Sequence, residues 1–283
     1  MSNDAMPAAA AGELGSRTER CFADGTHADT LSAIAARRWV CGDASHSIAA
    51  ERVFVRFDLA PGAAAPGFLE TRRAAVTGID LLTVDAAGRK LTAHFAPSEL
   101  LPSRRGGFIR VPLPSTEAPV RQVIVAFDQP THRMLLEQAQ LAPSDAHDSL
   151  PARRLLLVLA GLCGLLLMPI MFNAAFYRIL REPFVVWHSA LAVSLLLTIF
   201  VSSGLSFYVG NLPVMTMSSM NTLLFGLSVG AAGMFARSFI EDGKLHPWLR
   251  RALPVAGAWA VLVSSLHAAF PFVLRPMQSA LYY

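Results

Sequence analysis

The stretch Pro183–Ala236, PFVVWHSALAVSLLLTIFVSSGLSFYVGNLPVMTMSSMNTLLFGLSVGAAGMFA, decides the fold because it contains no Asp, Glu, Lys or Arg. As a single helix it would be roughly 80 Å long, whereas the hydrocarbon core of a bilayer is about 30 Å thick. The chain must therefore reverse its direction inside this stretch. The residues that favour a turn lie in its middle: Gly204, Gly210, Asn211 and Pro213. The stretch predicts two membrane-spanning helices, near residues 183–208 and 214–236.

Two further charge-free runs, Leu155–Tyr177 and Ala252–Leu274, are each long enough to cross a membrane. They predict two more spans, near 155–177 and 252–274, so that the transmembrane domain covers residues 155–283. No such run occurs before Leu155. The expected fold class is an all-β sandwich or jelly roll followed by an α-helical membrane domain. This domain has four transmembrane helices embedded in the lipid bilayer.

The soluble half is expected to fold as short strands, because β-rich segments alternate with turns containing Gly, Pro or charged residues. The predicted strands are Val53–Leu59, Phe68–Val76, Ile79–Val84, Leu91–Phe95, Phe108–Leu113 and Gln122–Phe127. We expect a disordered leader at residues 1–20, a β-sandwich domain at 21–141 and a linker at 142–154. Gly106 and Gly107 are interpreted as a turn, not as a phosphate loop.

Charge favours an orientation with the N-terminal domain outside the cytoplasm. The net charge of +4 comes from the membrane half, where most cations fall between spans one and two or between spans three and four. Cytoplasmic loops carry the excess of Lys and Arg in membrane proteins. We therefore expect a multi-pass protein of the bacterial inner membrane with a periplasmic N-terminal domain. Residues 1–20 do not resemble a secretory signal peptide, and we expect the chain to be part of a longer protein.

Cys21 and Cys41 lie ahead of the predicted strands and form a disulfide if this half is exported, because periplasmic thiols can oxidise. Such a loop would stabilise the domain by roughly 3 kcal/mol. The alternative is that they are two unrelated small apolar residues. Cys163, among leucines in the first span, is expected to face lipid or another helix.

Small and polar residues within the spans suggest contacts between helices. Thr222, Gly226 and Gly230 recur every four residues, which lets another helix approach closely, either within the bundle or in a homodimer. Three polar residues are candidates for a role at membrane depth: Asn173, Asn221 and His267. His267 is read either as a proton-sensitive switch or, with more support, as an interhelical hydrogen-bonding group.

Signatures of catalysis are missing from the sequence, which lacks G-x-x-x-x-G-K-[ST], H-E-x-x-H and G-x-S-x-G. The histidines of the soluble half show no metal-ligand spacing, and its charges balance, so that no basic patch points to nucleic acid. We expect no enzyme activity, no cofactor, no metal site and no nucleic-acid partner.

Several segments resemble those of one known family. The longest is Phe172–Pro183, followed by Phe235–Ile240 and His246–Arg251, and upstream Arg52–Leu59 and Val84–Arg89. They are similar to segments of bacterial seven-transmembrane receptors with diverse intracellular signalling modules, over about Cys21 to Arg275. This resemblance implies an extracytoplasmic jelly-roll sensor, seven helices and a cytoplasmic output module, often a GGDEF diguanylate cyclase or a histidine kinase.

The chain departs from that pattern because it predicts four spans, a truncated seven-helix domain, and contains no Gly-Gly-Asp-Glu-Phe motif or kinase box. The leading hypothesis is the sensory and transmembrane portion of a signalling receptor, with an unknown extracytoplasmic ligand. By analogy with the family, the sandwich fold is compatible with binding of a carbohydrate, but no sequence feature identifies the ligand. The alternative is a membrane subunit of a transporter or of a membrane enzyme complex.

Overall fold

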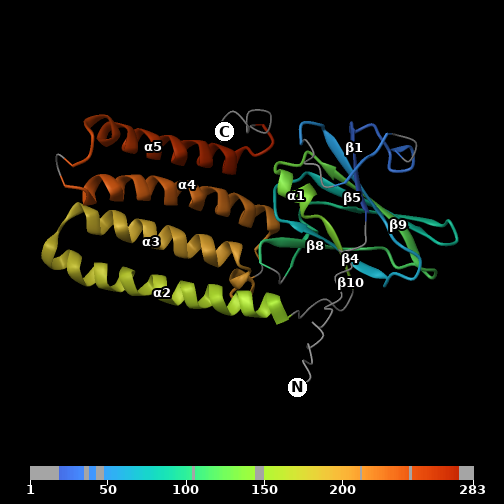
Figure 1. Cartoon of the computed structure of the whole chain (residues 1–283), viewed down its shortest axis with the longest axis horizontal. Helices are drawn as coiled ribbons and strands as arrows, with labels where there is room; N and C mark the ends of the chain where they lie inside the picture. The colour runs from blue at the N-terminus through green and yellow to red at the C-terminus, as the bar shows by residue number, and fades with distance from the viewer. Residues whose placement is uncertain are drawn as a thin grey trace, which may run out of the picture.

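The computed structural model describes residues 19–34, 38–42, 48–103, 106–143, 150–210, 212–241 and 244–273. The molecule has two parts that lie end to end: a domain of β-strands, here the β-domain, and a bundle of long helices (Figure 1). The expected fold class, a β-sandwich followed by a helical membrane domain, is confirmed. Of the expected leader, residues 1–18 lie outside the described residues, and Glu19 and Arg20 already belong to a strand.

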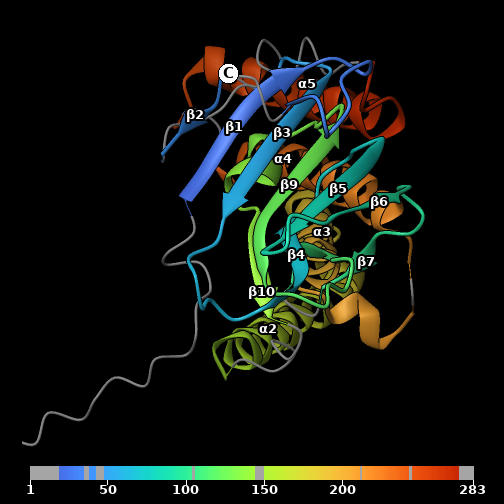
Figure 2. The ribbon, with the colours of Figure 1, turned by 90° about the vertical axis from the view of Figure 1, so that its right-hand side faces the viewer.

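The β-domain consists of two antiparallel sheets. The six-stranded sheet has, in spatial order, β2 (Val40–Cys41), β1 (Glu19–Gly25), β3 (Arg52–Asp58), β9 (Val120–Asp128), β5 (Gly78–Asp85) and β6 (Lys90–Phe95). The four-stranded sheet has β10 (Gln140–Pro143), β4 (Pro66–Arg72), β8 (Phe108–Pro112) and β7 (Leu101–Pro102). Figure 2 shows the long strands β1, β3, β9 and β5 side by side.

The main core lies between the two sheets, and the six-stranded sheet is also covered on its other face. Val53, Val55 and Phe57 of β3 point into the main core. Phe54, on the opposite face, packs in a second apolar cluster with Leu31 and other residues of the β1–β2 connection. Because both faces are buried in its middle, β3 has three successive apolar residues, Val53–Val55, which explains its incomplete alternation.

Four strands were not expected from the sequence: β1, β2, β7 and β10. The expectation that Cys21 and Cys41 precede the strands is wrong, because Cys21 lies in β1 and pairs directly with Cys41 in β2. β4 ends at Arg72 and not at Val76, because the chain crosses there from the four-stranded to the six-stranded sheet. β10 extends through Pro143 into the stretch expected to be linker.

Four helices are long and apolar enough to cross a membrane: α2 (Leu150–Leu180), α3 (Pro183–Ser202), α4 (Val214–Phe239) and α5 (Pro247–Ala269). α3 ends six residues before the expected residue 208, since Gly204 takes a left-handed conformation (φ 83°) and a short 3-10 helix, η4 (Leu205–Tyr208), follows. α5 begins and ends five residues earlier than the expected 252–274, because Pro247 occupies its first turn.

The helices lie in a row in which each packs against the next along the chain (Figure 1). α2 and α4 run away from the β-domain, and α3 and α5 run back toward it. We call the two ends of the bundle the β-domain end and the far end. The far end contains the α2–α3 and α4–α5 connections.

A disulfide joins Cys21 to Cys41, 20 residues apart, and closes the connection that covers the outer face of the six-stranded sheet. Replacing both residues by alanine should lower the free energy of unfolding by about 3 kcal/mol, because the unfolded chain regains the freedom of that loop. Thermal unfolding of the full chain in detergent, followed by circular dichroism, measures this loss. A reducing agent should produce a similar loss in the wild type and none in the variant. A variant as stable as the oxidised wild type would contradict the prediction.

Candidate functional site

The β-domain contacts the bundle through Arg73, which follows β4 and reaches the end of α3. Its Nη2 donates a hydrogen bond to the carbonyl oxygen of Val201 at 2.8 Å, and Nη1 lies 3.1 Å from Sδ of Met217 on α4. The last carbonyls of a helix have no partner within the helix and carry its partial negative charge. Arg73 therefore caps α3 from another domain. Burial, together with the nearby charge of Arg72, lowers the pKa of Arg73 to about 10, so it remains charged at neutral pH.

The turn at Gly106 and Gly107 presses against the same helix end. A Cβ atom on Gly106 would lie 2.1 Å from the carbonyl oxygen of Ser203, and one on Gly107 would lie 3.2 Å from that of Ser202. Gly107 also has a left-handed φ of 76°, a conformation that favours glycine. Its carbonyl accepts a hydrogen bond from the backbone N–H of Arg73 at 2.8 Å. The turn and Arg73 thus form one rigid contact surface.

The first turn of α4 completes this junction from the side of the bundle. Val214 is 1% exposed and belongs to the main core of the β-domain. Met217, one turn later, is fully buried and also receives a contact from the hydroxyl of Ser206 in η4, at 3.5 Å. We define the junction as Arg73, Gly106, Gly107, Val201–Ser203, Val214 and Met217.

Helix α1 (Arg133–Glu137) lies on the side of the β-domain that faces the bundle (Figure 1). His132 caps it, since Nδ1 accepts a hydrogen bond from the backbone N–H of Met134 at 3.1 Å. Part of the His132 ring meets solvent, but neighbouring protein atoms displace water, and this desolvation lowers the pKa of His132 below 6.5. Glu137 opposes the shift and Arg72 adds to it.

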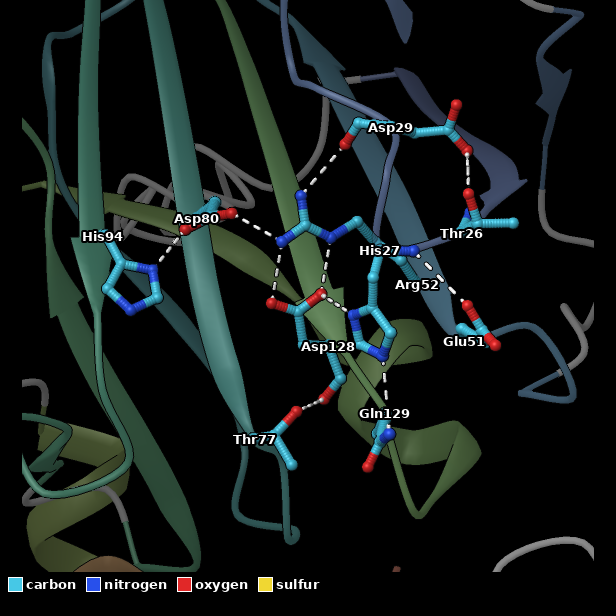
Figure 3. A network of polar contacts seen from close by, with 10 residues as sticks. All are labelled: Thr26, His27, Asp29, Glu51, Arg52, Thr77, Asp80, His94, Asp128 and Gln129. Atoms are coloured by element: carbon cyan, nitrogen blue, oxygen red, sulfur yellow. Dashed lines mark hydrogen bonds and ion pairs between the residues drawn. The ribbon is translucent and has the colours of Figure 1, made fainter.

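A polar network crosses the outer face of the six-stranded sheet (Figure 3). The guanidinium of Arg52 on β3 lies between two carboxylates: it donates to Asp128 on β9 at 2.5 and 2.8 Å, and to Asp80 on β5 at 2.7 Å. His94 on β6 contacts Asp80 at 2.5 Å, and His27 lies 3.7 Å from Asp128. The hydrogen bond from Arg52 to Asp128 is the main reason that the pKa of Arg52 is raised.

The network is asymmetric in its exposure to solvent. Arg52, Asp80 and Asp128 are largely buried, whereas the side chains of His94 and His27 are 65% and 49% exposed. The carboxylates of Asp80 and Asp128 share the single guanidinium of Arg52, so these three groups together carry a net negative charge. The imidazoles of His94 and His27 lie next to them on the side exposed to solvent. Arg52 also donates to the carbonyl of Asp29, which ties the β1–β2 connection to the sheet.

The network and the junction lie at two ends of one hydrogen-bonded pair of segments. Thr77 donates from its backbone N–H and its hydroxyl to the carbonyl of Asp128, at 3.0 and 3.2 Å. Thr131 donates in the same two ways to the carbonyl of Ala75, at 3.2 and 2.8 Å. Residues 73–77 and 128–132 therefore run together from Asp128 to Arg73 and His132.

Comparison with known proteins identifies the membrane domain. Residues 155–283 match the family model described as 7TM diverse intracellular signalling. Over these residues the membrane domain is similar to this family. The match agrees with the resemblance carried by Phe172–Pro183, and it indicates a sensory membrane receptor. No curated protein matches the chain.

Within this 7TM diverse intracellular signalling domain, the small residues expected to allow close packing lie between α4 and α5. A Cβ atom on Gly226 would lie 2.5 Å from the side chain of Ser264, and one on Gly230 would lie 2.8 Å from that of Val261. The hydroxyl of Thr222 donates to the carbonyl of Ser218 in its own helix.

The three polar candidates of the spans lie apart from one another. Asn173 on α2 hydrogen-bonds His188 on α3 at 2.8 Å. Asn221 has a buried Oδ1 without a hydrogen-bond partner among the described residues. His267 lies two residues before the end of α5, beside the β-domain rather than deep in the span, and it is close enough to His132 for their charges to interact.

Sequence reasoning missed Arg73 and the Arg52 network. Arg73 follows another arginine just after β4, and its partner, the carbonyl oxygen of Val201, is 128 positions away. Arg52 and Asp128 lie at strand ends, where charged residues are common, and Asp80 is the third residue of β5. Among the described residues, no group of three or more His, Cys, Asp or Glu could hold a metal ion.

The lowered pKa of His132 predicts a pH-dependent stability. The unfolded chain binds the proton more tightly than the folded one, so stability should be lost as pH falls below 6.5 and through the lower folded pKa. Protonation also removes the Nδ1 acceptor that caps α1. The variant His132→Asn keeps a capping acceptor and does not titrate. Its melting temperature should therefore exceed that of the wild type increasingly as pH falls from about 8 to about 5. A constant difference over that range would contradict the prediction.

Proposed function

We propose that this chain is the sensory and transmembrane portion of a receptor in the bacterial inner membrane. In this proposal the β-domain lies in the periplasm and binds an extracytoplasmic ligand, and the bundle passes the signal to an intracellular output. The observation that carries the proposal is the junction. Here a sandwich domain caps a membrane helix with a partly buried arginine and receives the first residue of the next helix in its core.

The positions of the cations support the proposed orientation. Arg178 and Arg181 lie at the α2–α3 connection, and Arg237, Lys244, Arg250 and Arg251 lie at the α4–α5 connection, all at the far end of the bundle. Short cytoplasmic loops carry such an excess of positive charge. The far end would therefore face the cytoplasm, where an output module acts. We propose a diguanylate cyclase or a histidine kinase for that output, as the family resemblance implies.

The contacts of the junction are made with one particular part of the bundle, the α3–α4 hairpin. Arg73 contacts the end of α3 and the first turns of α4, and Gly106 abuts Ser203 in the connection between them. A ligand shifts a conformational equilibrium only if it binds the two conformations with different affinities. A ligand that preferred one arrangement of the sandwich would move this hairpin through Arg73.

The Arg52 network is the proposed contact region for the ligand. Its exposed His94 and His27 contact the largely buried carboxylates of Asp80 and Asp128 on one face of the sheet. Thr77 is hydrogen-bonded to Asp128, and the chain segment that ends at Thr77 begins at Arg73. Carboxylates and imidazoles can hydrogen-bond the hydroxyl groups of a carbohydrate, the ligand class that the family resemblance implies.

A ligand screen on the full chain in nanodiscs tests the function. We expect one or more members of a panel of neutral sugars, amino acids and small carboxylates to raise the melting temperature. In a Cys163→Ala background, spin labels at Ile179→Cys and Leu249→Cys should then report a changed distance at the far end. The variant Arg73→Gln should still bind this ligand but lose most of the distance change, because it removes the charged contact with α3.

The matched control is Arg121→Gln, which removes an exposed arginine at the opposite end of β9. This control should bind and respond like the wild type. A panel without any thermal shift would contradict the sensor function. A full distance change in Arg73→Gln would leave the sensor function intact but disprove transmission through the junction.

Labelling of intact cells tests the orientation separately. A membrane-impermeant maleimide should reach Ala87→Cys, in the exposed turn between β5 and β6, but not Lys244→Cys at the far end. After lysis both positions should react to the same extent. The reverse pattern in intact cells would show that the β-domain lies in the cytoplasm.

A further inference from the structure

A cavity of about 470 Å³ opens at the far end of the bundle, between the last turn of α4 and the first two turns of α5. The described residues of its lining are three arginines and two prolines: Arg237, Arg250, Arg251, Pro247 and Pro254. None of these described lining residues is acidic. The nearest described acidic residue along the chain, Glu241, forms an ion pair with Lys244 at 2.7 Å, and both side chains are exposed.

The lining combines positive charge with apolar walls. Arginine presents several N–H donors in a planar fork that matches the oxygens of a phosphate group. Proline has no N–H and contributes only its ring and its carbonyl. A small hydrated anion would use the arginines alone, whereas a phosphate that carries an apolar substituent would use both kinds of wall.

Exposed large apolar side chains lie on or next to the helix turns that supply the lining residues. Phe239, Trp248 and Val255 are 63%, 69% and 70% exposed. Aromatic residues of this kind are enriched where the polar headgroups of a membrane meet its hydrocarbon. The cavity thus lies at the end of two predicted spans, at the level where lipid headgroups are found, and basic pockets between helices bind such headgroups.

We propose that this cavity binds the phosphate group of an anionic membrane phospholipid. The phosphate would accept hydrogen bonds from the arginines, and the glycerol and upper acyl chains would lie against the proline rings and the exposed apolar side chains. This site is separate from the junction and from the proposed ligand region, since it lies at the opposite end of the bundle. Free inorganic phosphate offers the same chemistry to the arginines, so the test must distinguish the two sources.

The experiment uses the full chain in a neutral detergent, with short-chain phosphatidylglycerol, short-chain phosphatidylcholine and inorganic phosphate as probes. Phosphatidylglycerol should raise the melting temperature in a saturable manner, and the other two probes should have much weaker effects. The variant Arg237→Gln/Arg251→Gln should weaken the apparent affinity for phosphatidylglycerol by about tenfold or more, because charge-assisted hydrogen bonds are lost.

The matched control, Arg178→Gln/Arg181→Gln, removes two arginines at the same end of the bundle but outside the cavity. It should retain the affinity of the wild type. Equal losses in both variants would show a diffuse attraction to the positive end and would overturn the site. An equal effect of inorganic phosphate would assign the cavity to a soluble anion and overturn the lipid. No stabilisation by any probe would overturn both.

Discussion

The carbonyl groups at the end of α3 impose the constraint on which the arrangement of the two domains depends. A helix that leaves the membrane has four terminal carbonyls without intrahelical donors, and each must find water or another donor. Here the carbonyl of Val201 is bonded by Arg73, whose guanidinium lies 2.8 Å away. The positive charge also opposes the negative end of the helix dipole. A connection that could have been an independent loop is thereby fixed to a neighbouring domain.

Burial on both faces of the six-stranded sheet has a second consequence, because polar residues on its outer face cannot all reach water. Phe54 is covered by the β1–β2 connection, which the Cys21–Cys41 disulfide closes. Toward the end of the same face the covering segment meets charged groups, and Arg52 satisfies Asp80, Asp128 and the carbonyl of Asp29 together. Removing one member of such a group leaves buried charge uncompensated. The network therefore fixes the relative positions of β3, β5 and β9 and of the segment above them.

The sequence indicates those features that depend on local composition. Charge-free runs identify the four helices, and β-rich segments identify six of the strands: β3, β4, β5, β6, β8 and β9. It does not indicate β1, because Glu19–Gly25 contains three charged residues among its seven, nor β2, which has only two. The end of α3 was misplaced because the apolar run continues beyond Gly204, whereas the backbone there is left-handed. Arg73 could not be recognised, since its role depends on a carbonyl supplied by a distant segment.

Differences in helix packing determine where a movement of the α3–α4 hairpin would appear in the bundle. α4 and α5 approach so closely that the side chains of Ser264 and Val261 occupy the space of the missing Cβ atoms on Gly226 and Gly230. The backbone of Gly230 in turn packs against Gly257. If one helix slid past the other, Ser264 or Val261 would meet a residue that has a side chain instead of a glycine. These two helices are therefore expected to move together. α3 is joined to α4 by the hydrogen bond between Ser194 and Ser228 at 3.1 Å. Among the described helices α2 packs mainly against α3, and Asn173 and His188 form a hydrogen bond between them. If α3, α4 and α5 moved as a unit, their position relative to α2 would therefore change.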